Sequence, residues 1–97
     1  MDERKGRIVM ATGVFDILHP GHLHYLREAK ALGDWLVVIV ATDRTVMKRK
    51  NHTPITPQGM RLEMISALKP VDEAYIGSDT DPYEIVERIR PDIIALG

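Results

Sequence analysis

The sequence contains no cysteine, and this absence excludes two classes of small protein. Without thiols the chain cannot form a disulfide framework or hold zinc through thiolate ligands. No uninterrupted apolar run comes near the roughly 18 residues that a membrane-spanning helix needs, so no membrane partner is expected. The first six residues, MDERKG, lack the apolar segment of a secretory signal, and the expected location is therefore the cytoplasm.

The sequence also lacks an excess of basic charge. Its 13 Lys and Arg residues are matched by 14 Asp and Glu residues, for a formal net charge of −1. A general nucleic-acid-binding surface needs a basic excess, so nucleic acid is not an expected partner and any anion site must be a local cluster. Amide residues are scarce, with only Asn51 and Gln58, and 28% of residues are charged; this balance is typical of heat-adapted proteins.

The chain of 97 residues is long enough for one domain, and we expect residues 1–97 to form it. Trp35–Ala41 is apolar without polar alternation, which predicts a strand covered on both faces in a parallel sheet. Asp81 before Pro82, with Glu84 following, is a helix-start signal. The expected strands cover 8–12, 35–41, 73–76 and 92–96, the expected helices cover 21–32, 57–69 and 82–90, and an irregular polar stretch covers 42–56.

The alternation of strands and helices predicts an α/β fold. With right-handed crossovers it becomes a doubly wound, Rossmann-like parallel sheet in three layers, α/β/α. Ligands of such sheets bind beyond the carboxyl ends of the strands, at the switch point of the strand order. The segments Thr12–His22, Thr42–Asp43 and Gly77–Ser78 are expected at that edge.

The step from the first strand to the first helix carries the clearest chemical signal, His19-Pro20-Gly21-His22. Two histidines three residues apart at a helix start project to the same side, beside backbone N–H groups without intrahelical partners. Gly21 leaves room for close approach, and the helix dipole favours an anion, so this corner is suited to a phosphate. Imidazole groups there can donate hydrogen bonds to transferring phosphoryl oxygens.

These histidines allow two other interpretations. They could be surface residues without a role, or the four histidines of the chain could bind a metal. His24 lies two residues after His22 and points elsewhere on the helix, and no carboxylate stands at ligand spacing, so no protein-held metal is expected. The G-x-G-x-x-G pattern of dinucleotide-binding proteins is absent from this turn.

The segment Gly13–His22, followed by 26–34, closely resembles the cytidylyltransferase-like family of nucleotidyltransferases, which includes glycerol-3-phosphate cytidylyltransferase and archaeal FAD synthetases. The resemblance continues through 41–43, Arg61, 71–73 and 91–97, nearly the whole chain. It implies that His19 and His22 contact the NTP phosphates and stabilise the transition state. The implied nucleotide-binding residues are Thr12, Gly13, Val14, Phe15, His19, Gly21 and His22.

The resemblance also implies roles for charged residues. Lys48 and Arg61 would join the two histidines in catalysis, and Lys48 with Lys50 would correspond to a basic pair of the family. The implied acceptor-binding residues are Asp16, Asp43, Lys50 and Arg61. The alternative for Lys48-Arg49-Lys50 is a solvated basic loop; a place beside an anion site favours the functional interpretation.

The resemblance implies transfer of a nucleoside monophosphate from an NTP, with Mg²⁺, to a phosphate-bearing acceptor, with release of pyrophosphate. An FAD-synthetase-like reaction of ATP with FMN is favoured on Val9–Asp16 and Leu68–Asp72. One alternative is a CTP-dependent cytidylyltransferase acting on glycerol 3-phosphate.

Family members continue beyond the last strand with an acidic pair, a fifth strand and a Ser/Thr-rich motif that binds the triphosphate. The chain is therefore expected to be truncated at its C-terminus. This leaves open a nucleotide-binding domain that is catalytically incomplete, or a fragment that acts as a folding or assembly unit. An exposed last strand also predicts a homodimer.

Overall fold

A computed structural model describes residues 6–96 of the chain as a four-stranded sheet with helices on both sides. The N-terminal segment before Gly6, expected not to be a signal, and Gly97 lie outside the described residues. None of the helices within residues 6–96 combines the length and the apolar character needed to cross a membrane. In chain order the elements are β1 (Ile8–Gly13), α1 (Pro20–Ala31), β2 (Trp35–Val40), α2 (Asp43–Lys50), α3 (Gln58–Ser66), β3 (Glu73–Ile76), α4 (Pro82–Ile89) and β4 (Ile93–Ala95).

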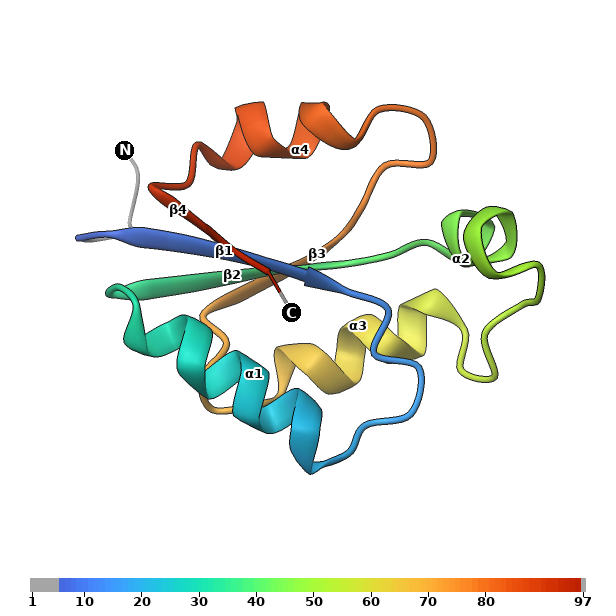
Figure 1. Ribbon diagram of the computed structural model, residues 1–97, viewed down its shortest axis with the longest axis horizontal. Helices are drawn as coiled ribbons and strands as arrows, with labels where there is room; N and C mark the ends of the chain where they lie inside the picture. Colours follow the sequence, from blue (N-terminus) through green and yellow to red (C-terminus); the bar gives the residue numbers. More distant parts are fainter. Residues whose placement is uncertain (1–5, 97) are drawn as a thin grey trace.

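The strands lie in the order β3-β2-β1-β4, and all three neighbouring pairs are parallel. Helices α1 and α3 cover one face of the sheet and α4 covers the other, while α2 lies beyond the carboxyl ends of β1 and β2 (Figure 1). This confirms the doubly wound, three-layer fold predicted from the sequence. The chain moves outward from β1 through β2 to β3 and then returns to place β4 on the other side of β1, so the switch point lies between β1 and β4.

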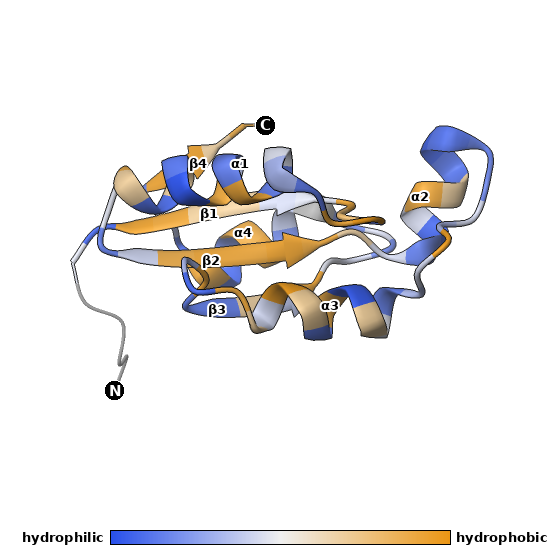
Figure 2. Cartoon of the chain, turned by 90° about the horizontal axis from the view of Figure 1, so that it is seen from below, coloured by the Kyte–Doolittle hydropathy of each residue, from blue (hydrophilic) through white to orange (hydrophobic). Residues whose placement is uncertain are grey.

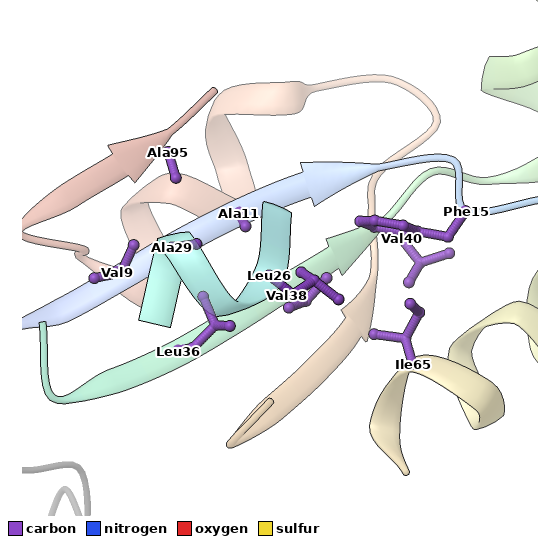
Figure 3. Close-up of a cluster of buried hydrophobic side chains, with 10 residues drawn as sticks. All are labelled: Val9, Ala11, Phe15, Leu26, Ala29, Leu36, Val38, Val40, Ile65 and Ala95. Atoms are coloured by element: carbon purple, nitrogen blue, oxygen red, sulfur yellow. The ribbon is translucent and has the colours of Figure 1, made fainter. Parts of the chain in front are cut away.

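The alternation of side chains along the strands divides the core between the two faces of the sheet. Apolar residues dominate β1 and β2 in the middle of the sheet (Figure 2). The larger buried cluster lies on the side of α1 and α3 (Figure 3) and consists of Val9, Ala11, Phe15, Leu26, Ala29, Leu36, Val38, Val40, Ile65 and Ala95. The intervening Met10, Val37 and Ile39 pack with Ile89 of α4 on the opposite face. Burial on both faces explains why the central strands read as continuous apolar runs.

The expectation of an irregular stretch over 42–56 is wrong, because Asp43–Lys50 form helix α2. The Thr42 side chain caps this helix by accepting a hydrogen bond from the Thr45 N–H at 3.0 Å. The helix ends at Asn51, whose φ of 59° is the left-handed conformation of a C-cap. Val46 is the one buried residue of α2, so the helix presents almost no apolar periodicity in the sequence.

Smaller differences concern the starts of two helices. Pro57 is the N-cap of α3 and not its first helical residue, and α1 begins at Pro20, with His19 as its N-cap. The second difference places His19 just outside the helix, where its side chain can cap the first turn. The predicted start of α4 is confirmed, since the Asp81 carboxylate accepts a hydrogen bond from the Tyr83 N–H at 3.0 Å.

Candidate functional site

A cavity of about 780 Å³ opens at the carboxyl end of the sheet. The end of β1, the turn into α1 and Leu96 just after β4 contribute to its wall, so it lies at the switch point. Of the site residues expected from the sequence, it gathers Thr12, Gly13, Val14, Phe15, Asp16, His19, His22 and Lys50.

His19 and His22 form a reciprocal cap at the start of α1. The Gly21 N–H donates to Nδ1 of His19 at 3.0 Å, and the His19 N–H donates to Nδ1 of His22 at 3.3 Å. The two rings stack with centroids 3.9 Å apart. Because both Nδ1 atoms accept, a neutral ring in either position carries its proton on Nε2. The pair therefore offers two Nε2–H donors side by side at the cavity.

The environment of His22 favours its neutral form. Burial lowers the pKa of His22 below its ordinary value of 6.5, and repulsion by the neighbouring His19 lowers it further. The Phe15 ring stands edge-on to His22, with centroids 5.4 Å apart, and stacks on Tyr25. The Tyr25 hydroxyl in turn donates to the carbonyl oxygens of Thr12 and Ala95, so it ties α1 to the ends of both strands beside the cavity.

The backbone of this turn differs from the sequence-based expectation of unpaired N–H groups. The Gly21 N–H is bonded to His19 Nδ1, and the His22 and Leu23 N–H groups both donate to the His19 carbonyl oxygen. The imidazole Nε2 atoms are therefore the main donors that the turn presents. Gly21 is required by the cap itself, because a Cβ there would lie 2.7 Å from Cε1 of the His19 ring.

Asp16 connects the turn after β1 to the segment before α3. Its two carboxylate oxygens accept hydrogen bonds from the Ile55 N–H at 3.0 Å and the Thr56 N–H at 2.8 Å. These two bonds, Thr56 first, lower the pKa of Asp16 below its ordinary value of 3.8. Asp16 thus orders a loop of the site, and its contact with an acceptor stays a prediction.

Arg61 lies in a different setting from the one expected of a phosphate-binding residue. Its side chain is buried, with a relative exposure of 1% for the residue. The guanidinium donates to the carbonyl oxygens of Val14, Ala41 and Thr56 and pairs with the Asp43 carboxylate at 2.7 Å. Neither Arg61 nor Asp43 is among the residues that line the cavity.

The cations in the last turn of α2 are distributed around the site. Lys50 lines the cavity that contains the histidines, while Arg49 lines a second cavity of about 360 Å³. Lys48 belongs to the lining of neither, so its catalytic role stays a prediction. Arg49 has no predicted role of its own, and its position in the basic run Lys48-Arg49-Lys50 is the only sequence signal for it.

The second cavity lies on the α4 side of the sheet. Its apolar wall includes Met10, Ile39 and Val86, and its polar residues include Thr42 and Ser78. It shares Thr12, Gly13 and Val14 with the first cavity, so the two spaces adjoin across the end of β1. The sequence predicts residues 42–43 and 77–78 near this edge but does not reveal two separate cavities.

Three further residues of the first cavity were not expected from the sequence: Ile17, Tyr25 and Leu96. Ile17 and Leu96 expose apolar surface, with 60% and 87% relative exposure. Ile17 and Leu96 line one cavity because the turn after β1 lies beside the end of β4 in the fold. Local sequence does not reveal this proximity. Within residues 6–96, no three His, Asp or Glu side chains gather at a possible metal site.

Comparison with known proteins places this geometry in a family. The model of the cytidylyltransferase-like family matches residues 10–97. The chain belongs to the cytidylyltransferase-like family. The match covers the cavity lining, both histidines and Arg61, and it agrees with the resemblance seen in the sequence.

Curated relatives of this family member include proteins named FAD synthase. That of Methanothermobacter thermautotrophicus is 58% identical over 94 residues, which cover 94% of this chain and 62% of the relative. That of Thermococcus onnurineus is 56% identical over 96 residues, covering 98% of this chain and 64% of the relative. The chain thus spans about three fifths of the length of these relatives.

A solved structure has the same fold. The crystal structure of a protein described as the lipopolysaccharide core biosynthesis protein from Thermoplasma volcanium matches with a TM-score of 0.87 and 50% sequence identity. The match covers 93% of this chain and 73% of the other.

The hydrogen bonds of Asp16 predict a pH-dependent contribution to stability. Because the folded-state pKa lies below 3.8, the stabilisation by the ionised carboxylate is present above about pH 4 and is lost as pH falls through the folded pKa. Asp16→Asn should therefore lower the free energy of unfolding at pH 7, and the difference from the parent chain should shrink below pH 4. Urea denaturation across this range measures it, with Glu28→Gln as an exposed control; a difference that stays constant with pH contradicts the assignment.

Proposed function

We propose that this domain binds ATP and transfers its AMP group to the phosphate of FMN, releasing pyrophosphate. The observation that carries the proposal is the stacked pair His19 and His22 at the N-terminus of α1, in a cavity at the switch point. Phosphoryl-type transfers need little covalent help from a protein, so positioned donors account for much of the catalysis. The pair supplies such donors beside the positive end of a helix dipole.

In the proposed reaction an oxygen of the acceptor phosphate attacks the α-phosphorus of ATP. A new phosphorus–oxygen bond forms as the bond from the α-phosphorus to the oxygen bridging to the β-phosphate breaks, and pyrophosphate leaves with that electron pair. The Nε2–H groups of His19 and His22 would donate to the oxygens on which charge grows, and Lys50 would add positive charge at the same cavity. No covalent enzyme intermediate is required.

The two adjoining cavities suit a reaction between two substrates. ATP would occupy the larger cavity with the histidines, and the acceptor would occupy the smaller one on the α4 side. The shared residues Thr12, Gly13 and Val14 mark where the reacting groups would meet. A glycine in this wall permits close approach of the substrate to the backbone.

Two observations favour FMN as the acceptor: curated relatives are named FAD synthase, and the smaller cavity has an apolar wall. An apolar wall that includes Met10, Ile39 and Val86 suits a planar flavin ring, and Arg49 offers a cation for the phosphate of the acceptor. A small polyol phosphate such as glycerol 3-phosphate would leave the apolar wall without a partner.

The residues present fit Mg²⁺ as a companion of the nucleotide. Mg²⁺ is commonly held by substrate phosphates with few protein carboxylates, and the first cavity offers one carboxylate, that of Asp16. The metal would neutralise charge on the phosphates, while the histidines and Lys50 orient them.

Pyrophosphate release tests the proposal directly. The chain is incubated with Mg²⁺ while ATP or CTP is crossed with FMN or glycerol 3-phosphate. Release is expected with ATP and FMN together and with no other combination. ATP binding by calorimetry without release in any combination would contradict catalysis by this chain and favour a nucleotide-binding domain; release only with CTP and glycerol 3-phosphate would contradict the choice of substrates.

Histidine variants serve as controls in the same assay. His19→Ala or His22→Ala should lower kcat by about 10²–10³-fold with a smaller effect on KM, because the donors act mainly on the transition state. His24→Ala should change little, since this exposed side chain faces Glu28 on the outer surface of α1. An unchanged kcat for either of the first two variants would remove that histidine from the mechanism.

We also propose that the domain forms a homodimer. β4 is an edge strand of three residues, and Ile94 and Leu96 expose apolar surface beside its open edge. Open edges with apolar neighbours favour pairing with another chain. Sedimentation should show a dimer at micromolar concentration, and a monomer throughout the concentration range would contradict it.

The cytoplasmic location, the adaptation to heat and the absence of a nucleic-acid partner stay predictions from the sequence. They are compatible with a domain that acts on small phosphorylated substrates. Lys50, Arg49 and the imidazole of His19 line the two cavities at the carboxyl end of the sheet. A chain with almost no net charge needs such a local cluster to bind an anion.

A further inference from the structure

Arg61 is an arginine whose side chain is buried in the interior of the domain. Burial of a charge is unfavourable unless hydrogen bonds and a counter-charge compensate it. Here four hydrogen bonds do so: Nε donates to Thr56 O at 2.8 Å, one terminal nitrogen donates to Val14 O at 2.7 Å and Ala41 O at 2.8 Å, and the other pairs with Asp43 at 2.7 Å. Four of the five N–H donors are thus engaged by the protein.

The partners of Arg61 come from separate segments around the site. Val14 belongs to the turn after β1 and lines both cavities, and Ala41 follows β2 and lines the second. Thr56 precedes α3, and Asp43 opens α2. One planar group therefore sets the relative positions of the connections that follow β1 and β2.

The turn after β1 is held on both sides of Phe15. Arg61 binds the carbonyl of Val14 on one side, and the Asp16 carboxylate binds the N–H groups of Ile55 and Thr56 on the other. Between these two anchors Phe15 has a φ of 52°, a left-handed conformation that a bulky residue rarely adopts unless its surroundings hold it there. The Phe15 ring is buried and stands edge-on to His22.

We infer that Arg61 is a positioning residue, which holds the Val14 carbonyl so that Phe15 stays in its left-handed conformation and its ring fixes His22 in the site. Arg61 thus acts on the reaction through His22 and not by contact with phosphate. The inference deepens the proposed function and rests on it for its effect on turnover. Its structural part, the coupling from Arg61 through Phe15 to His22, is independent of any substrate.

The test uses Arg61→Lys, Phe15→Leu and the double variant, with Arg44→Lys as the matched change at an exposed arginine of α2. The first measurement is the NMR titration of the His22 ring in the folded chain without nucleotide. The titratable groups around His22 are His19, stacked on it, and Asp16, Tyr25 and Lys50 in the same cavity. All of them are retained in every variant.

Arg61→Lys and Phe15→Leu should each raise the pKa of His22. Both changes weaken the packing of Phe15 against the His22 ring, and a less buried ring is protonated more easily. If Arg61 acts through Phe15, the shift in the double variant should be no larger than that of the greater single variant. Arg44→Lys should leave the His22 titration unchanged. An unchanged His22 titration in folded Arg61→Lys, or additive shifts in the double variant, would overturn the inference.

Steady-state kinetics add a readout that separates positioning from phosphate binding. Arg61→Lys should lower kcat by about 10- to 100-fold with less than about threefold change in KM for ATP. A raised KM with unchanged kcat would show direct substrate contact and overturn the inference. If the chain proves to have no transferase activity, the proposed function fails while the His22 titration still decides the coupling.

A variant that does not fold would leave the substitution of Arg61 uninformative, so Asp43→Asn provides a second route. It removes the ion pair but keeps an oxygen acceptor and leaves the other three bonds of Arg61 in place. A smaller rise in the pKa of His22 is expected, in the same direction. No change in the His22 titration of folded Asp43→Asn would count against the inference in that case.

Discussion

The hydrogen bond from the Gly21 N–H to Nδ1 of His19 is the contact on which the site depends most directly. It begins α1, places the proton of a neutral His19 ring on Nε2 and brings that ring against His22. The cap uses Nδ1 of His19 and leaves Nε2 for the proposed contact with phosphate, so the structural contact orients the donor of the proposed one. Gly21 is needed because any side chain there would displace the ring.

A second set of contacts fixes the position of the turn after β1 relative to the other segments at the carboxyl edge of the sheet. The Tyr25 hydroxyl bonds Thr12 and Ala95, while Asp16 and Arg61 fasten the turn to the segment before α3. Such preorganisation costs stability, through a strained Phe15 and a buried charge, and it is typical of sites whose donors must be in place before the substrate arrives. Hydrogen bonds of the buried Arg61 and the partly buried Tyr25 therefore fix the backbone that forms the cavity wall.

Sequence patterns predicted those parts that depend on local or periodic signals. The apolar runs predicted the four strands, and His19-Pro20-Gly21-His22 predicted a polar helix start at the turn that lines the first cavity, because helix starts have a local chemistry. Helix α2 was missed because only Val46 is buried, although Thr42 and Asn51 carry cap signals. The setting of Arg61 was missed because its partners lie up to 47 residues away, at Val14, and three of the four are backbone oxygens that no side-chain pattern reveals.

The contact on which the proposed function depends most is that of the stacked histidines with the phosphates of a nucleotide at the switch point. Its most direct test is an NMR titration of the chain with ATP and Mg²⁺, following the ring signals of His19 and His22 and the backbone amides. If the contact forms, the largest changes should fall at these two rings and over residues 12–16 and 21–23, with little change at β3 on the sheet edge. Saturable ATP binding that leaves both rings unchanged, or shifts centred on β3, would contradict it.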